Sequence, residues 1–204
     1  GGQGTEEWLR ARLGVPSASN FAKVVTTAGK RSTSFNSYVN ALIAERLTGD
    51  PTYVKITEPM ERGTSLEDEA RAMYQLIEEV DVRQVDFIKH PNMEVGCSPD
   101  GLIDKEQDGL IGGLEIKCPL QGTHVEYLRA GKLPSKYVLQ VQGCMFVTGR
   151  GFWDFMSYHP KMRPFMIRTY RDDDLINELV TNLQEAVLMI DEGVNKFQWD
   201  GVKT

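Results

Sequence analysis

Apolar residues in the first third of the chain recur every three or four positions, which is the spacing of a helix that buries one face. One run predicts a helix over residues 35–47, which the Gly-Asp-Pro sequence at 49–51 ends. A second run predicts a helix over residues 59–79, with an apolar stripe and a strongly acidic remainder. Serine and asparagine residues at the start of segment 17–27 can cap a shorter helix there.

From residue 82 onward the helical spacing gives way to short runs rich in β-branched residues, separated by turn-forming clusters such as Ser-Pro-Asp-Gly. This pattern predicts a meander of strands, then two helices, two further strands and a long helix that begins at an acidic run. The expected strands span residues 82–88, 93–97, 102–104, 110–117, 152–158 and 165–170. The expected helices span residues 123–130 and 135–147, and a last helix begins at residues 172–174 with an apolar face that includes Ile190. The order predicts one α/β domain over residues 1–204, in which helices flank a mixed β-sheet.

The composition is that of an ordinary globular chain. Its 204 residues, 41% of them hydrophobic and 25% charged, are enough to bury a sizeable core. No apolar run reaches the roughly 18 residues that a membrane-spanning helix needs, and the N-terminal segment lacks the features of a secretory signal. The three cysteines include no Cys-x-x-Cys pair, which favours reduced thiols over disulfides. We therefore expect a cytoplasmic protein that does not associate with membranes.

The net charge of −6 argues against a polyanionic partner until its distribution is considered. Residues 38–116 carry seven Lys and Arg against seventeen Asp and Glu, whereas residues 117–171 carry nine against two. An acidic block followed by a basic block suits a site that gathers divalent cations on one side and a polyanion on the other. Solvated helix faces of uneven charge explain the same distribution equally well.

The candidate chemistry lies in the expected meander. On its last strand, Glu115 and Lys117 project to one face, while Leu114 and Ile116 point the other way into packing. Partly burying a glutamate and a lysine is costly, so the pair is either a structural ion pair or part of a functional site. Asp100 lies in a turn of the same meander, and folding back would bring its carboxylate beside that of Glu115.

Two neighbouring carboxylates need a cation to keep both ionised. Mg²⁺ is the natural candidate, because it prefers oxygen ligands and is often held by one or two carboxylates together with a substrate phosphate. A lysine beside it can orient or help to deprotonate an attacking water and can stabilise the charge that develops at the phosphorus. The alternative is a surface aspartate near an unrelated ion pair.

Asp100 followed by Glu115-Ile116-Lys117 resembles the signature of the PD-(D/E)xK nuclease superfamily, whose fold is a restriction-endonuclease-like mixed β-sheet flanked by α-helices. Five segments in order along the chain further resemble the phage lambda exonuclease, or YqaJ-type viral recombinase, family. They are WLRARLGVPSAS (8–19), RGTSLEDEAR (62–71), CSPDG (97–101), LEIKCP (114–119) and YVLQVQ (137–142). Together they span residues 8–142.

The resemblance implies a metal centre. Asp100 and Glu115 would bind the metal together with the carbonyl of Ile116, and Lys117 would lie at the attacking water. Glu67 would be an outer acid or a ligand of a second metal. Without the resemblance, a surface ion pair with Arg71, one helical turn further on, is the better explanation of Glu67.

The resemblance also implies contacts with the substrate. Tyr137 and Gln140, one helical turn apart, would lie against the scissile phosphate or the water. Arg12 would receive the 5′-terminal phosphate, since a guanidinium binds phosphate with two parallel hydrogen bonds. Ser17 and Ser19 would lie near that phosphate. The ordinary alternatives are an amphipathic helix with a buried tyrosine, a surface arginine and two helix-capping serines.

The function that the resemblance implies is a 5′-to-3′ exonuclease dependent on Mg²⁺, with Mn²⁺ as a possible substitute and two ions in the substrate complex. It would degrade one strand of linear double-stranded DNA to 5′-mononucleotides and leave a 3′ single strand for annealing-type recombination. The resemblance further implies a ring-shaped homotrimer, a single-strand annealing protein as partner, and a phage or prophage origin in a bacterial host. The alternatives are an endonuclease or repair nuclease on the same scaffold, and a non-catalytic DNA-binding scaffold.

Overall fold

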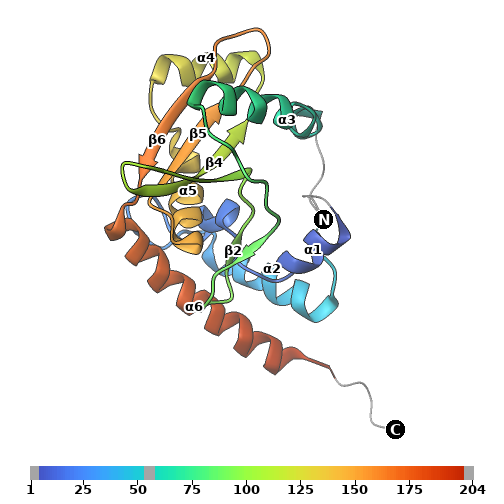
Figure 1. The fold of residues 1–204 in the computed structure, drawn as a ribbon. Coiled ribbons are helices and arrows are strands. Elements are labelled where there is room, and N and C mark those ends of the chain that lie inside the picture. The colour runs from blue at the N-terminus through green and yellow to red at the C-terminus, as the bar shows by residue number, and fades with distance from the viewer. Residues whose placement is uncertain (1–4, 53–57, 200–204) are drawn as a thin grey trace.

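The computed structural model describes residues 5–52 and 58–199 (Figure 1). Its centre is a four-stranded sheet in the order β3-β4-β5-β6. The two inner strands run parallel, and each outer strand is antiparallel to its neighbour. The strands are β3 (Gly101–Gln107), β4 (Leu110–Lys117), β5 (Phe152–Ser157) and β6 (Phe165–Tyr170). The predicted mixed sheet flanked by helices is confirmed.

Helices cover both faces of this sheet (Figure 1). On one face, α3 shares a buried cluster with Leu114 and Ile116 of β4. On the other face, α5 contacts β4 and β5, and it extends a larger core towards α2 and α6. The helices are α1 (Glu6–Arg12), the 3₁₀ helix η1 (Ala18–Lys23), α2 (Phe35–Thr48), α3 (Glu58–Glu78), α4 (Gln121–Ala130), α5 (Ser135–Thr148) and α6 (Asp173–Phe197).

Two glycines of β4 allow the central strands to pack closely. A Cβ atom on Gly112 would lie 2.1 Å from Cε2 of Phe152, and a Cβ atom on Gly113 would lie 2.3 Å from Cη2 of Trp153. Both aromatic rings of β5 therefore cover the backbone of β4, and both are fully buried. A side chain at either glycine would displace a ring and shift β4 just before Glu115.

The strand predicted over residues 82–88 is wrong for most of its length. The apolar residues of this segment divide between two buried clusters, so the segment crosses from one to the other instead of following a neighbouring strand. Arg83 forms an isolated bridge with Leu102. Regular pairing resumes only between β1 (Ile88–Lys89) and β2 (Gly96–Cys97).

Several helix bounds also differ from the predicted ones. The helix expected over residues 17–27 is only the short η1, because Val25 leaves it to pair with Arg31. The spacing of apolar residues does not predict α1, whose start is capped by the hydroxyl of Thr5. The last helix starts within the acidic run, as predicted, and continues to Phe197. Among the described residues, none of the helices is both long enough and apolar enough to cross a membrane.

Candidate active site

β4 carries the first two candidate residues. Glu115 and Lys117 lie on one face of the strand, and Leu114 and Ile116 lie on the other face, buried beneath α3. The prediction from strand alternation is therefore confirmed. Glu115 is almost completely buried, with 1% of its area exposed, whereas the side chain of Lys117 is 30% exposed.

The two carboxylate oxygens of Glu115 differ in their surroundings. Oε1 accepts hydrogen bonds from the Lys117 ammonium and from Nε2 of Gln140, the latter at 2.6 Å. Oε2 is buried and has no hydrogen-bond partner among the described residues. A buried carboxylate oxygen without a partner is energetically unfavourable. This oxygen therefore suits a cation or a hydrogen-bond donor supplied from outside the chain.

Asp100 lies immediately before β3 and is fastened to β4. The backbone N–H of Ile116 donates to Oδ2 of Asp100 at 2.6 Å. The antiparallel register, which pairs Gly101 with Leu114, brings the two segments together. The expectation that the meander folds Asp100 back beside the Glu115 strand is therefore confirmed.

Burial and neighbouring charges set the protonation of this group. Burial raises the pKa of Glu115 above its ordinary value; the Asp100 carboxylate adds to the rise, and Lys117 opposes it. Burial alone would lower the pKa of Lys117, but the Glu115 and Asp100 carboxylates outweigh it and the pKa of Lys117 is raised. Lys117 is therefore an ammonium ion at neutral pH in this arrangement. An ammonium suits orienting a water and stabilising negative charge better than it suits proton abstraction.

Glu67 reaches the same region from α3. Its Oε1 accepts from Arg71, so the ion pair along the helix does form. Burial raises the pKa of Glu67, and the negative charge of the Asp100 carboxylate raises it further. Glu67 therefore forms the ion pair with Arg71 that the alternative explanation predicted, and it also interacts electrostatically with Asp100.

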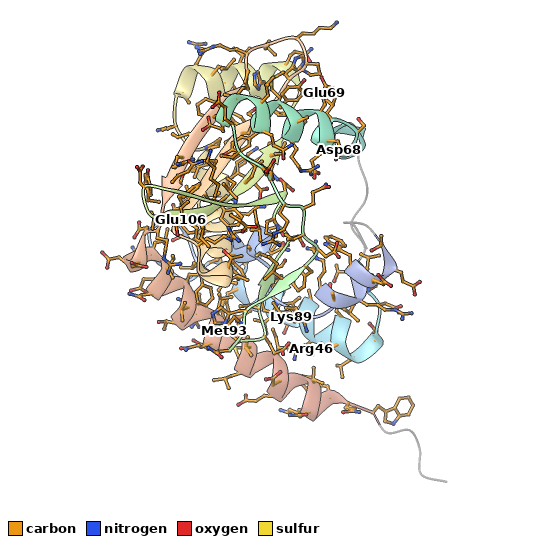
Figure 2. The ribbon with its side chains drawn as sticks, in the orientation of Figure 1. Arg46, Asp68, Glu69, Lys89, Met93 and Glu106 are labelled. Carbon is orange, nitrogen blue, oxygen red and sulfur yellow. The ribbon has the colours of Figure 1, made fainter. Side chains whose placement is uncertain are left out.

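Arg71 is more than the surface partner that the sequence suggested. It is 6% exposed, and its Nε donates to the backbone carbonyl of Asp100 at 3.1 Å. It also pairs with Asp68, which Figure 2 labels on α3. Arg71 therefore ties the helix that carries Glu67 to the turn that carries Asp100. The sequence feature that could have indicated this role is the position of Arg71 at the end of the 62–71 segment, in a mostly acidic helix.

The two candidates on α5 flank Glu115 and Lys117. Gln140 donates to Glu115, as described above. The ring of Tyr137 stacks on Phe155 with ring centroids 5.1 Å apart, and Nζ of Lys117 lies 5.4 Å from the Tyr137 centroid. Tyr137 is therefore partly packed, as the ordinary alternative expected, and also beside the Lys117 ammonium.

Arg12, Ser17 and Ser19 form a second polar cluster. Nη2 of Arg12 is 3.5 Å from Oγ of Ser17, a weak contact, and the two serine hydroxyl oxygens are 3.4 Å apart. Burial lowers the pKa of Arg12, although its guanidinium remains charged at neutral pH. Ser17 occupies the N-cap position of η1 without a capping hydrogen bond from its side chain, so the capping role predicted for it is wrong. Its hydroxyl faces Arg12 instead.

Trp8 connects this cluster to the Asp100 turn. The Arg12 guanidinium lies over the Trp8 ring, 4.1 Å from the centroid. The indole N–H of Trp8 donates to the hydroxyl of Ser98 at 3.0 Å, two residues before Asp100. Both Trp8 and Ser98 lie in segments that the sequence singles out, but nothing in the sequence indicates that they meet.

The donor set fits a hard divalent cation. Two carboxylates and a backbone carbonyl are oxygen ligands, and Mg²⁺ keeps several waters, so it does not need a complete protein cage. The buried, unpartnered Oε2 of Glu115 is the observation that agrees with such a cation. Within residues 5–52 and 58–199, no cluster of three or more His, Cys, Asp or Glu side chains is arranged to hold a metal, so the chain alone would supply only part of the coordination.

Two hollows on the surface lie elsewhere. One, of about 750 Å³, is lined by residues that include Asp81, Arg83 and Asp104. The other, of about 290 Å³, is lined by Asp154, by Tyr74 and Arg168, which both donate hydrogen bonds to Asp154, and by three further residues. Neither is lined by Asp100, Glu115 or Lys117, so the candidate site is distinct from both.

Comparisons with known proteins found one family model and several similar solved structures. The YqaJ-like viral recombinase domain matches residues 7–151. LHK-Exo, an alkaline exonuclease from Laribacter hongkongensis, is 38% identical, with a TM-score of 0.83, over 94% of this chain and 95% of that one. A structure of LHK-Exo in complex with dAMP gives 37% identity over the same shares, again with a TM-score of 0.83.

A phage-related exonuclease from Haemophilus somnus 129PT shares the fold. It is 16% identical, with a TM-score of 0.68, over 89% of this chain and 96% of that one. The likeness to these solved structures extends across nearly the whole chain. No curated protein matches the chain.

Proposed function

Because the chain belongs to the YqaJ-like viral recombinase family, we propose that it is a 5′-to-3′ exonuclease dependent on a divalent metal. The family and the likeness to an alkaline exonuclease support a nuclease that acts on DNA. The finer proposal is that it degrades one strand of linear double-stranded DNA to 5′-mononucleotides. The remaining 3′ single strand would serve annealing-type recombination. The observation that carries the proposal is the buried, unpartnered oxygen of Glu115, a carboxylate whose other oxygen accepts from Lys117 and whose pKa the Asp100 charge raises.

We propose that Asp100, Glu115 and the Ile116 carbonyl hold one Mg²⁺, which Mn²⁺ can replace. Glu67 would contribute to a second ion when substrate is bound, after exchanging part of its contact with Arg71. When bound, a divalent cation lowers the pKa of a coordinated water and neutralises charge on the phosphate. The oxygen-only donor set and the depth of Glu115 support this assignment.

The other side chains would act on the substrate. The Lys117 ammonium would orient the attacking water and stabilise negative charge at the phosphorus. Gln140 would keep Glu115 in place through its 2.6 Å hydrogen bond. Tyr137, next to Lys117, would border the position of the scissile phosphate. LHK-Exo has been crystallised with dAMP, a deoxynucleoside monophosphate, and the product that we propose belongs to this class.

We further propose, from the family alone, the setting in which the enzyme works. It would assemble as a ring-shaped homotrimer and pass its 3′ strand to a single-strand annealing protein. It would act in the cytoplasm of the bacterial host of a phage or prophage. Sedimentation of the purified protein would test the trimer independently of activity.

Closed circular DNA distinguishes the proposal from its alternatives. We expect the protein to degrade a linear duplex in Mg²⁺ and to leave a covalently closed circle of the same sequence intact, because an exonuclease needs an end. EDTA should stop the reaction. Cleavage of the closed circle would indicate an endonuclease or repair nuclease instead. Binding of the linear duplex without any product in Mg²⁺ or Mn²⁺ would indicate a non-catalytic scaffold.

Arg12 should set the preference for a 5′-phosphate. We expect Arg12→Gln to reduce the preference for 5′-phosphorylated over 5′-hydroxyl ends by about 10- to 100-fold, the value of one or two charge-assisted hydrogen bonds. Initial rates on the two substrates would measure this preference. The control is Arg10→Gln, an exposed arginine of the same helix that pairs with Glu6. An equal loss of rate on both ends would contradict the assignment.

A further inference from the structure

The cations in the most basic part of the chain fall into two groups. Residues 117–171 contain nine Lys and Arg side chains. Four of them form ion pairs with neighbouring carboxylates. The other five are exposed, and in the part of the chain that the structure describes none of them has an ion pair: Arg129, Lys132, Lys136, Lys161 and Arg163. We call these five residues the α4 rim.

The fold gathers the α4 rim around one helix. Arg129 ends α4, and Lys132 and Lys136 follow in the connection to α5 and in its first turn. Lys161 and Arg163 lie in the turn between β5 and β6, which Figure 1 shows beside α4 at one end of the molecule. Nε2 of His124 on α4 is 3.0 Å from the backbone carbonyl of Arg163, so this turn is held against the helix.

The α4 rim is continuous with the candidate active site. Nζ of Lys136 lies 5.0 Å from the centroid of the Tyr137 ring. Nζ of Lys117 lies 5.4 Å from the same centroid. The Tyr137 ring therefore lies near both Lys136 of the rim and Lys117, the residue proposed to stabilise the reacting phosphate.

Local structure does not account for this concentration of charge. A basic residue at a helix C-terminus is favourable, which explains Arg129 but not the other four. Glu126 is the one acid of α4, and the other acid of this stretch, Asp154, is buried and paired with Arg168. Like charges that outnumber the nearby acids and form no ion pairs among the described residues repel one another in the free protein, and a bound polyanion relieves that repulsion.

We propose that the α4 rim binds the phosphate backbone of the DNA that leads into the active site. The proposal rests on the proposed function, because it identifies the polyanion as the substrate. Each lysine or arginine that neutralises a phosphate releases condensed counterions, so it contributes both to affinity and to its dependence on salt. Contacts of this kind position the DNA without reading its sequence.

The test compares two double variants that lose the same charge. Lys132→Gln/Lys161→Gln changes the rim, and Lys105→Gln/Lys196→Gln changes exposed lysines on β3 and on α6, which lie outside the rim. In Figure 1, α6 ends at the opposite end of the molecule from α4. Affinity for a 5′-phosphorylated duplex oligonucleotide is measured over a series of salt concentrations in EDTA, which prevents hydrolysis. Thermal unfolding checks that both variants are folded.

We expect the slope of log affinity against log salt to become shallower for the rim variant by about 0.9 for each lysine that contacts duplex DNA, or about 0.7 for each that contacts a single strand. The control variant should keep the wild-type slope. A rim variant with the control's slope would overturn the proposal, whether the rim is idle or binds an acidic protein. If the wild type degrades DNA in Mg²⁺ but the rim slope is unchanged, only the rim proposal fails. If the wild type neither binds nor degrades DNA, both proposals fail.

Discussion

Replacing Glu115 by glutamine should reduce hydrolysis of linear duplex DNA by about a thousandfold or more. The substitution preserves the shape and the hydrogen bond acceptor of the side chain but removes the charge that would hold a cation. It also places an amide beside Gln140 and Lys117, both of which donate to Glu115. Initial rates of nucleotide release at saturating Mg²⁺ measure the effect.

The control for this variant is Glu106→Gln. Glu106 is an exposed glutamate of β3, labelled in Figure 2, and its loss should leave the rate within about twofold of wild type, as is usual for surface substitutions. Isothermal titration with Mn²⁺ separates loss of metal from loss of chemistry. A Glu115→Gln protein that is folded and retains wild-type activity would contradict the assignment of Glu115 as a metal ligand.

Replacing Lys117 by methionine should lower kcat by about 10²- to 10⁴-fold while metal binding is retained. Methionine keeps the aliphatic length that packs beside Tyr137 but lacks the ammonium. Without that positive charge the pKa of Glu115 should rise further, so higher pH should be needed to load the metal. Single-turnover rates at saturating metal measure the first effect, and titration with Mn²⁺ at several pH values measures the second.

Lys117→Arg and Lys105→Met serve as controls for this result. Arginine restores a cation with a different shape, so partial recovery of kcat is expected. Lys105 is an exposed lysine of β3, outside the candidate site, and should tolerate methionine. If Lys117→Met loses metal binding and kcat together, Lys117 is needed to assemble the site and its proposed role at the water is wrong.

The sequence predicted those parts of the fold in which local pattern and final packing agree. Residues 110–117 alternate as a strand should, and the two faces of β4 separate Glu115 from Leu114 as expected. Segment 82–88 has similar β-branched composition, but its apolar residues pack in two different cores. It pairs only through the bridge at Arg83 and through Ile88, where β1 begins. Pairing partners are a property of the tertiary structure, which composition within one segment does not reveal.

The sequence predicted the local part of the candidate site but not the contacts that distant segments bring to it. The proximity of Asp100 to β4 follows from a short meander, whose turn length and antiparallel pairing are local. The burial of Glu115 to 1% and the unpartnered Oε2 are products of tertiary packing, and the hydrogen bond to Oε1 comes from Gln140 on α5, which begins 20 residues further along the chain. The hydrogen bond from Trp8 to Ser98 joins residues that are 90 positions apart, and the local sequence around either residue does not predict it.

The most direct test of the central claim uses a linear duplex labelled at one 5′-phosphate, with Mg²⁺ or with EDTA. Wild-type protein in Mg²⁺ should release the label as a 5′-mononucleotide from the beginning of the reaction, with no release in EDTA. A duplex labelled at its 3′ end should retain its label at early times. Release that is unaffected by EDTA, or that begins at the 3′ end, would contradict a metal-dependent 5′-to-3′ exonuclease centred on Asp100, Glu115 and Lys117.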